Sequence, residues 1–262
     1  MSTPVRPLKA LGQHFLNSPE TAARIAGSLQ INDSFDTILE IGPGTGVLTS
    51  LLKLHTDKKF YCIDVDQRSV AYLEAAYPEL VGRIVAGDFL NHSLDFLGSG
   101  NFAVIGNFPY NISSQILFRV LDMYKRVPQV VGMFQKEVAE RIASPAGSRD
   151  YGILSVLLQA HYDIEYLFTV PPEIFIPPPK VQSGVIRMTL KENPELPCDP
   201  VVFKQVIKTA FNQRRKTMRN SLKSILPLDT SEVPFLQMRP EQLDYTQFIL
   251  LTQILQRLRG NS

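Results

Sequence analysis

Four short, apolar and β-branched segments lie at close intervals in the first half of the chain, at residues 37–41, 60–65, 83–86 and 102–105. Each one runs into a turn that contains a glycine or an acidic residue. Apolar residues recur at helical spacing after the second segment and after the fourth, over residues 67–77 and 113–124. Short buried strands separated by helices form parallel sheets. The pattern therefore predicts an α/β fold, with a parallel sheet and helices on both of its faces.

The later part of the chain has a different organisation. Two further strands are expected at residues 162–169 and 181–190. The segment between them, Val170–Lys180, contains five prolines, which forbid regular structure and favour an extended loop. A linker at residues 193–200 precedes two helical patterns, at 202–223 and 240–259. We therefore predict a first domain of residues 1–194 and a small all-α domain of residues 195–262.

Composition describes an ordinary globular protein, because 44% of its 262 residues are hydrophobic and 20% are charged. The chain has no apolar run of ~18 residues, so no transmembrane helix and no membrane partner are expected. Its basic beginning lacks the apolar core of a signal peptide. Two cysteines far apart in sequence do not form a disulfide framework. We expect a monomeric protein of the cytoplasm.

Basic residues are concentrated in one stretch. Residues Lys204–Lys223 include seven Lys or Arg and no acidic residue, although the whole chain has a net charge of only +2. Such a block is either a solvated helix face or a surface that binds phosphate. Composition alone slightly favours the solvated face.

A glycine-rich turn, Gly42-Pro43-Gly44-Thr45-Gly46, follows the first predicted strand. Glycines allow a tight turn and a close approach of backbone to a ligand. The dinucleotide fingerprint needs a further glycine where this chain has Val47, and no Lys-Ser/Thr pair follows for a P-loop. Taken alone, the turn is compatible with a nucleotide-like ligand and with a purely structural role.

Acidic residues at the ends of the next two predicted strands add ligand groups. Asp64 is placed to accept the hydroxyls of a ribose, and Asp66 to cap the following helix. Asp88 is placed to accept from the amino group of an adenine, with Phe89 beside the ring. The carboxyl ends of parallel strands meet at one edge of a sheet. Together with the glycine-rich turn, these residues indicate a site for S-adenosylmethionine.

The fourth predicted strand ends at Asn107-Phe108-Pro109-Tyr110. The Asn107 side-chain oxygen and the Phe108 carbonyl can accept the two N–H groups of an exocyclic base amine. Pro109 fixes the turn, and Tyr110 offers a face on which the base stacks. Such positioning suits methyl transfer from an activated donor. The alternative is a plain strand-ending turn, which Asn, Pro and Tyr also favour.

A base reaches such a pocket only after leaving its stack, so single-stranded or loop nucleic acid is the expected substrate. Phe175, on the proline-rich loop, is a candidate for a second stacking face. Packing in the core is nearly as good an explanation for it. The spacing of His55, His92 and His161 indicates no metal site.

Six stretches, taken in order, carry a family pattern: LGQHFL at 11–16, EIGPG at 40–44, GNFPYNIS at 106–113, QKEVAER at 135–141, FIPPPKV at 175–181 and FNQRRKT at 211–217. They cover nearly the whole chain. In this combination the sequence resembles the ribosomal RNA adenine N6-dimethyltransferases, and within them the branch that acts on bacterial small-subunit (16S) rRNA. The family commonly has Glu where this chain has Asp64, and Leu where it has Phe108.

The resemblance implies a Rossmann-like class I methyltransferase sheet followed by a small C-terminal all-α domain. It implies the use of S-adenosylmethionine to dimethylate two adjacent adenines in a hairpin loop near the 3′ end of 16S rRNA, during assembly of the small ribosomal subunit. The implied donor site comprises His14, Leu16, Gly42, Asp64, Asp88 and Asn107. The phosphate contacts expected from the basic stretch are Arg214, Arg215, Lys216 and Arg219.

Two other functions are compatible with the sequence. One is the relative that methylates a single adenine of large-subunit rRNA and confers antibiotic resistance. The other is an RNA-binding assembly factor without enzymatic activity. The helical domain favours the small-subunit enzyme over the first, and the presence of Asn107, Tyr110 and Asp88 argues against the second.

Overall fold

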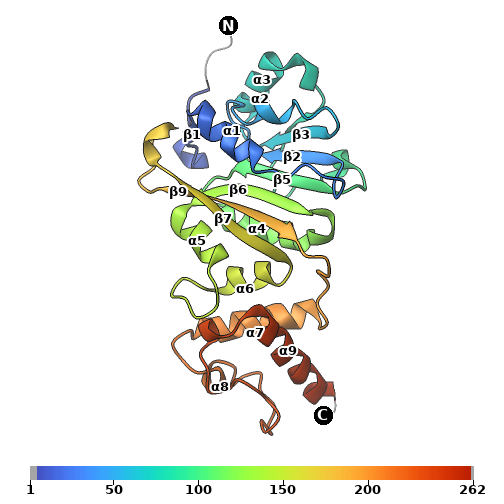
Figure 1. The fold of residues 1–262 in the computed structure, drawn as a ribbon, viewed down its shortest axis with the longest axis vertical. Coiled ribbons are helices and arrows are strands. Elements are labelled where there is room, and N and C mark those ends of the chain that lie inside the picture. Colours follow the sequence, from blue (N-terminus) through green and yellow to red (C-terminus); the bar gives the residue numbers. More distant parts are fainter. Residues whose placement is uncertain (1–4, 261–262) are drawn as a thin grey trace. The chain divides into compact units, whose positions relative to one another are not determined.

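The centre of the fold is a sheet that has seven strands within the described part of the chain, in the order β4-β3-β2-β5-β6-β9-β7 (Figure 1). In the computed structural model, which describes residues 5–260, the pairs β2–β3, β2–β5, β3–β4 and β5–β6 are parallel, and β9 is antiparallel to β6. The predicted parallel sheet is therefore confirmed, with an antiparallel addition at one edge. The strand bounds are β2 Thr37–Ile41, β3 Lys59–Asp64, β4 Ile84–Ala86, β5 Phe102–Asn107, β6 Gln129–Gln135, β7 Tyr162–Val170 and β9 Ser183–Leu190.

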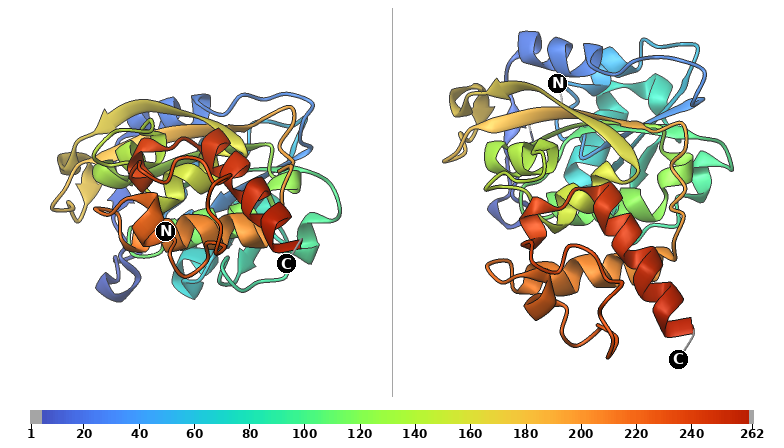
Figure 2. Two further views of the ribbon diagram at one scale, coloured as in Figure 1. Left: turned by 90° about the horizontal axis from the view of Figure 1, so that it is seen from below. Right: turned by 60° about the horizontal axis from the view of Figure 1, so that its bottom comes forward.

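The central strands are apolar because both faces of the sheet are covered. All five residues of β2 are buried, and so are the first five of β5. Near-continuous apolar runs are typical of parallel strands with helices on either side. Figure 2 shows helices packed around the sheet. The α-helices are α1 Pro19–Gly27, α2 Thr49–Leu52, α3 Gln67–Ala76, α4 Ser113–Asp122, α5 Lys136–Ala143, α6 Ile153–Gln159, α7 Pro200–Asn212, α8 Met218–Ser221 and α9 Tyr245–Gly260.

Side chains at the helix starts explain where several helices begin. Ser18 accepts a hydrogen bond from the backbone N–H of Thr21 at the start of α1, and Asp199 does the same for α7. Each cap satisfies a backbone donor that the helix itself leaves free. Short 3-10 helices complete the fold: η1 Lys9–Leu11, η2 Pro78–Leu80, η3 Asp95–Leu97, η4 Tyr124–Arg126, η5 Pro172–Ile174 and η6 Pro240–Gln242.

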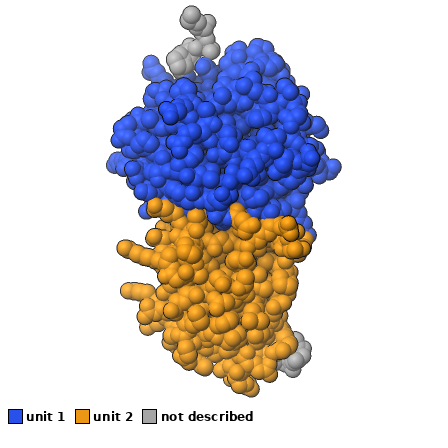
Figure 3. All heavy atoms as spheres, in the orientation of Figure 1, with its two compact units in different colours: residues 1–139, 164–190 blue, residues 140–163, 191–262 orange. Residues whose placement is uncertain are grey.

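The chain divides into two compact units (Figure 3). The first comprises residues 1–139 and 164–190, and the second comprises 140–163 and 191–262. Residues 140–163 belong to the second unit because their helix α6 packs against α7 and α9. These bounds differ from the predicted division at residue 194. The separate functions expected for the two predicted domains stay a prediction.

The proline-rich loop is more regular than expected. It contains η5 and a two-residue strand, β8 Phe175–Ile176, which pairs with β1 Phe15–Leu16. Residues 175 and 176 are not prolines, so their backbone groups are free to pair. In the second unit, the helix expected over residues 202–223 is broken. It ends at Asn212 and resumes at Met218.

Neither cysteine is in a disulfide. Cys62 is buried in β3, as expected for a small core residue, and Cys198 is half-buried. Among residues 5–260, no helix has both the length and the apolar character that crossing a membrane requires. The same part of the chain contains no group of three or more His, Cys, Asp or Glu side chains suited to a metal ion.

Candidate active site

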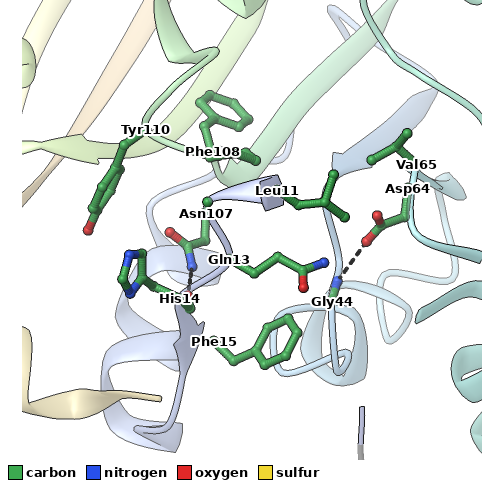
Figure 4. Close-up of a pocket in the computed structure, with 13 residues that line it drawn as sticks. Leu11, Gln13, His14, Phe15, Gly44, Asp64, Val65, Asn107, Phe108 and Tyr110 are labelled. Atoms are coloured by element: carbon green, nitrogen blue, oxygen red, sulfur yellow. Dashed lines mark hydrogen bonds between the residues drawn. The ribbon is translucent and has the colours of Figure 1, made fainter. Parts of the chain in front are cut away.

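A pocket lies where β2, β3 and β5 end, at the carboxyl edge of the sheet (Figure 4). Four parts of the chain line it: residues 11–15, two glycines of the turn after β2, the tip of β3 and residues 107–110. Segments far apart in sequence meet here because parallel strands present their carboxyl ends on the same side. This is the usual position of ligands in such folds.

The glycine-rich turn after β2 takes a backbone conformation that only glycine adopts readily. Gly42 has φ +67° and Gly44 has φ +56°. A Cβ atom on Gly44 would lie 2.8 Å from the ring of Phe15, whereas one on Gly42 would meet only Pro109, at 3.9 Å. Gly44 thus makes room for Phe15 and so for residues 11–15, the segment that crosses the pocket. Gly42 leaves an open surface beside it.

Asp64 ends β3 with its carboxylate directed at the glycine turn. One oxygen accepts from the backbone N–H of Gly44 at 3.2 Å and the other from that of Asp66 at 2.9 Å. Burial raises the pKa of Asp64, and these backbone hydrogen bonds oppose the rise. Carboxylate oxygens have further lone pairs, so Asp64 retains the capacity to accept hydroxyl groups of a ligand.

Asp66 has a structural role, as predicted. Its side chain accepts from the backbone N–H of Arg68 and caps α3. The Arg68 guanidinium pairs with it at 2.6 Å and is the main reason that the pKa of Asp66 falls to about 2. Asp66 also accepts from the Gln13 amide at 3.0 Å, which fastens the segment over the pocket.

Glu40 is an ionisable residue inside the apolar strand β2. Its side chain is 1% exposed and accepts a 2.6 Å hydrogen bond from the Thr49 hydroxyl. Burial raises the pKa of Glu40 to about 8, and the negative charge of Asp64 adds to this. The signal in the sequence is a carboxylate within an otherwise apolar strand.

Asn107, at the end of β5, is oriented by the segment that crosses the pocket. Its side-chain nitrogen donates a 2.9 Å hydrogen bond to the backbone carbonyl of His14. This leaves the amide oxygen on the side of Tyr110 (Figure 4). An amide whose N–H is engaged in this way presents its oxygen as an acceptor.

Phe108 contributes only its backbone to the pocket. Its ring is 1% exposed and packs edge-to-face on Phe134, with centroids 5.2 Å apart. Gly132 permits this packing, since a Cβ atom there would lie 2.5 Å from the Phe108 ring. The Phe108 N–H donates to the Met133 carbonyl at 3.2 Å, so the turn is tied to β6.

Tyr110 is held at both its hydroxyl and its ring. The hydroxyl shares a 2.6 Å hydrogen bond with Ser183 on β9. The ring stacks with His14, with centroids 5.6 Å apart and planes 24° apart. Burial raises the pKa of Tyr110, so the hydroxyl stays neutral. The aromatic ring therefore has a fixed position at the mouth of the pocket.

The pocket brings together most of the residues predicted for the site, but not all. The predicted residues that line it are Asn107, Phe108, Pro109, Tyr110, His14, Gly42 and Asp64. Leu16 does not, because its side chain is 4% exposed in the core beside β8. Asp88 does not line it either. Its carboxylate accepts from the backbone N–H of Leu90 and from the Asn91 amide.

Phe175 is in the hydrophobic core rather than in the pocket. Its side chain is 1% exposed, and its backbone pairs with Leu16. A ring enclosed in this way offers no face to a base, so the structure favours the packing alternative. The buried position follows from the pairing of β1 with β8, which no local sequence pattern predicted.

Five of the seven basic residues in the stretch 204–223 are exposed, and Lys204 and Arg214 are half-buried. The Arg214 guanidinium donates to the carbonyls of Ser148 and Arg149, and its Nε is buried. Arg214 therefore ties a loop to the end of α7 instead of presenting a free cation. Arg215, Lys216 and Arg219 are exposed.

Two residues that shape the pocket were not predicted. Gln13 lies within the LGQHFL stretch, so its neighbours were a usable signal. Ser183 holds Tyr110 from a position 73 residues away. Only the antiparallel pairing of β9 with β6 brings it there, and no local pattern encodes that contact.

Comparison with known protein families identifies the family to which the chain belongs. The family model for ribosomal RNA adenine dimethylase matches residues 7–257. The chain belongs to this family. Among its relatives is "Ribosomal RNA small subunit methyltransferase A" of Parabacteroides distasonis, which is 54% identical over 97% of this chain and 95% of the relative. The protein of the same name from Porphyromonas gingivalis is 53% identical over 97% of this chain and 99% of its own length.

Solved structures share the fold. A dimethyladenosine transferase from Plasmodium falciparum superposes with a TM-score of 0.80 at 24% identity and covers 93% of this chain and 98% of that one. A 23S rRNA methyltransferase superposes with a TM-score of 0.65, also at 24% identity, over 91% and 99%. The α/β sheet of this chain is therefore the methyltransferase sheet that the resemblance implied.

Proposed function

We propose that the chain transfers methyl groups from S-adenosylmethionine to N6 of two adjacent adenines, in a hairpin loop near the 3′ end of 16S rRNA. The products are N6,N6-dimethyladenosines, formed in the cytoplasm while the small ribosomal subunit is assembled. The names of relatives 53–54% identical over nearly the full chain support the small-subunit substrate. We expect the protein to act as a monomer.

The orientation of Asn107 is the observation that carries this proposal. Its N–H is engaged by the His14 carbonyl at 2.9 Å, which leaves its oxygen as an acceptor beside Tyr110. The Phe108 carbonyl, one residue further, is the second acceptor. An exocyclic adenine amine has two N–H groups to satisfy. Two acceptors beside an aromatic ring match a base with such an amine.

The residues of the pocket fit the proposed donor. Asp64 is a buried carboxylate with acceptor capacity for ribose hydroxyls, and the open face of Gly42 allows close approach of the ligand. S-adenosylmethionine supplies an activated methyl group on a sulfonium, so the protein needs to add little chemical activation. The contribution of the chain is to hold the base in line with that methyl group.

The acceptors also explain how the protein overcomes the poor nucleophilicity of the amine. The N6 lone pair is delocalised into the adenine ring. Hydrogen bonds to Asn107 and to the Phe108 carbonyl draw the nitrogen toward tetrahedral geometry, and stacking on Tyr110 fixes the ring. No strong base is needed, because the amine becomes acidic once it is alkylated. After the first transfer one N–H remains, so one acceptor continues to hold the base for the second.

The basic residues of the second unit provide the proposed RNA contact. Arg215, Lys216 and Arg219 are exposed, and the stretch has no acidic residue. Exposed cations bind the phosphate backbone without reading its sequence. The choice of adenine then depends on the pocket, and the choice of rRNA region on the shape of the subunit.

Transfer of labelled methyl groups to separated ribosomal subunits tests the proposal. We expect label in small subunits that lack the modification and none in large subunits. Label in large subunits alone would support the antibiotic-resistance function instead. Strong RNA binding with no label in either would favour an assembly factor without enzymatic activity.

A further inference from the structure

A second, wider pocket adjoins the one that contains Asn107. It has a volume of about 640 Å³, whereas the inner pocket has about 60 Å³. Both are lined by Gly12, Gln13, His14 and Tyr110, but only the inner one reaches Asn107. The shared residues form the partition between them. His14 and Tyr110 are the two aromatic side chains of this partition.

The His14 ring lies against one face of Tyr110. The two rings are stacked, with centroids 5.6 Å apart and planes 24° apart. The His14 Nδ1 donates to the Pro177 carbonyl at 2.7 Å, which holds the ring in place. An imidazole is a flat, aromatic, hydrogen-bonding ring, so it covers the Tyr110 face much as a nucleobase would.

The backbone of His14 is fixed independently of its ring. Its carbonyl accepts from Asn107, and the next residues, Phe15 and Leu16, pair with β8. A rotation about the side-chain bonds of His14 would therefore clear Tyr110 without disturbing the orientation of Asn107. Within residues 5–260, the polar contact that the ring must give up is the one to the Pro177 carbonyl.

The outer pocket has the composition of a nucleotide site. Its walls include the exposed lysines Lys9 and Lys180, and none of the described residues that line it is acidic. Apolar surface comes from residues 177–179 and Val181, and an amide from Gln135. Cations suit a phosphate, and flat apolar walls with a few polar groups suit a base.

We propose that the outer pocket binds a purine nucleotide of the substrate RNA, and that its base replaces the His14 imidazole on Tyr110. This inference rests on the proposed function and assigns His14 to the substrate side of the site. The Pro177 carbonyl and Tyr110 keep the passage closed until a base arrives. Lys9 and Lys180 hold the phosphate of the incoming nucleotide.

Adenosine monophosphate is a suitable probe, with histidine NMR signals as the readout. The chain has four histidines, and the His14→Asn variant identifies the signal of His14. We expect the nucleotide to shift the His14 signal, because the ring leaves the shielding field of Tyr110, and to leave the His55 signal in place. An unchanged His14 signal up to the solubility limit of the nucleotide would overturn the inference.

Affinities of three variants test the exchange directly. His14→Ala should bind adenosine monophosphate several-fold more tightly than wild type, because no ring has to be displaced. Lys180→Ala should weaken binding of the nucleotide several-fold and that of adenosine much less. His55→Ala, at a residue that lines neither pocket, should behave as wild type. Equal or weaker binding by His14→Ala would contradict the displacement.

Methyl transfer to small subunits, measured on the same wild-type preparation, separates the two proposals. Transfer without displacement of His14 would remove this inference and leave the proposed function intact. Displacement without transfer to either subunit would remove the proposed function, while the nucleotide site would stand.

Discussion

The side-chain amide of Asn107 and the backbone carbonyl of His14, 93 residues apart in sequence, are joined by a hydrogen bond of 2.9 Å. This contact determines which end of the amide faces the pocket. Because the partner is a backbone carbonyl, substitution of the His14 side chain does not remove it. The segment that crosses the pocket therefore sets the geometry of the proposed acceptor.

Replacement of Asn107 tests the role of that acceptor. Asn107→Ala should lower kcat for methylation of small subunits by about 100-fold or more, since positioning is lost. Binding of S-adenosylmethionine, measured by calorimetry, should remain detectable. Asn193→Ala, at an exposed position after β9 that lines neither pocket, serves as the control and should stay close to wild type. A turnover near that of wild type in Asn107→Ala would remove Asn107 from the mechanism.

Substitutions of the neighbouring residues Asp64 and Asp66 should have different effects, the first on donor binding and the second on stability. Asp64→Asn should weaken binding of S-adenosylmethionine by about tenfold, as expected for a lost hydrogen bond to a charged group. Asp66→Asn should instead lower the free energy of unfolding by about 1 kcal/mol, because it weakens the cap of α3 and the pairing with Arg68. Calorimetric titration and chemical denaturation measure the two effects. Equal donor affinity in Asp64→Asn and wild type would contradict the proposed ribose contact.

The buried Glu40 should make stability depend on pH. Its pKa is about 8 in the folded protein, against 4.5 for an ordinary glutamate. Between these values the folded state keeps a proton that the unfolded chain loses, so rising pH favours unfolding. The free energy of unfolding of wild type should therefore fall by about 5 kcal/mol relative to that of Glu40→Gln as the pH rises from 4.5 to 8.

Denaturation curves for wild type and Glu40→Gln across that pH range measure the difference. Glu74→Gln, at an exposed position of α3, is the control and should follow wild type throughout. A constant difference between Glu40→Gln and wild type would mean that Glu40 is ionised in the folded state.

The basic residues of the second unit should divide into two groups. Replacing Arg215, Lys216 and Arg219 together by alanine should weaken binding to small subunits and reduce its salt dependence by about two to three charges. Arg214→Ala should mainly lower stability, because the carbonyls of Ser148 and Arg149 lose their donor. An unaltered salt dependence in the triple variant would show that RNA binds elsewhere.

Sequence patterns predicted the sheet well because its strands are short, apolar and β-branched. The segment at 37–41 coincides with β2, and the one at 102–105 lies within β5. The residues at the ends of these strands could also be anticipated, since parallel topology collects them at one edge. Asp64 and Asn107 therefore meet in one pocket.

Long-range pairings were beyond local patterns. The β1–β8 pair joins Leu16 to Phe175 and buries both side chains, so neither side chain lines the pocket. The end of α7 likewise directs Arg214 to a loop of residues 148–149 instead of to solvent. Each of these outcomes depends on a partner distant in sequence, so no spacing rule could reveal it.

Nucleoside analysis of small-subunit RNA shows whether the protein dimethylates two adjacent adenines. Small subunits that lack the modification are incubated with the protein and S-adenosylmethionine, and the 3′ region of their rRNA is analysed by mass spectrometry. We expect N6,N6-dimethyladenosine at two neighbouring positions, and its absence when Asn107→Ala replaces the wild-type protein. Unmodified adenines after incubation with the wild type, or the same products with Asn107→Ala, would contradict this expectation.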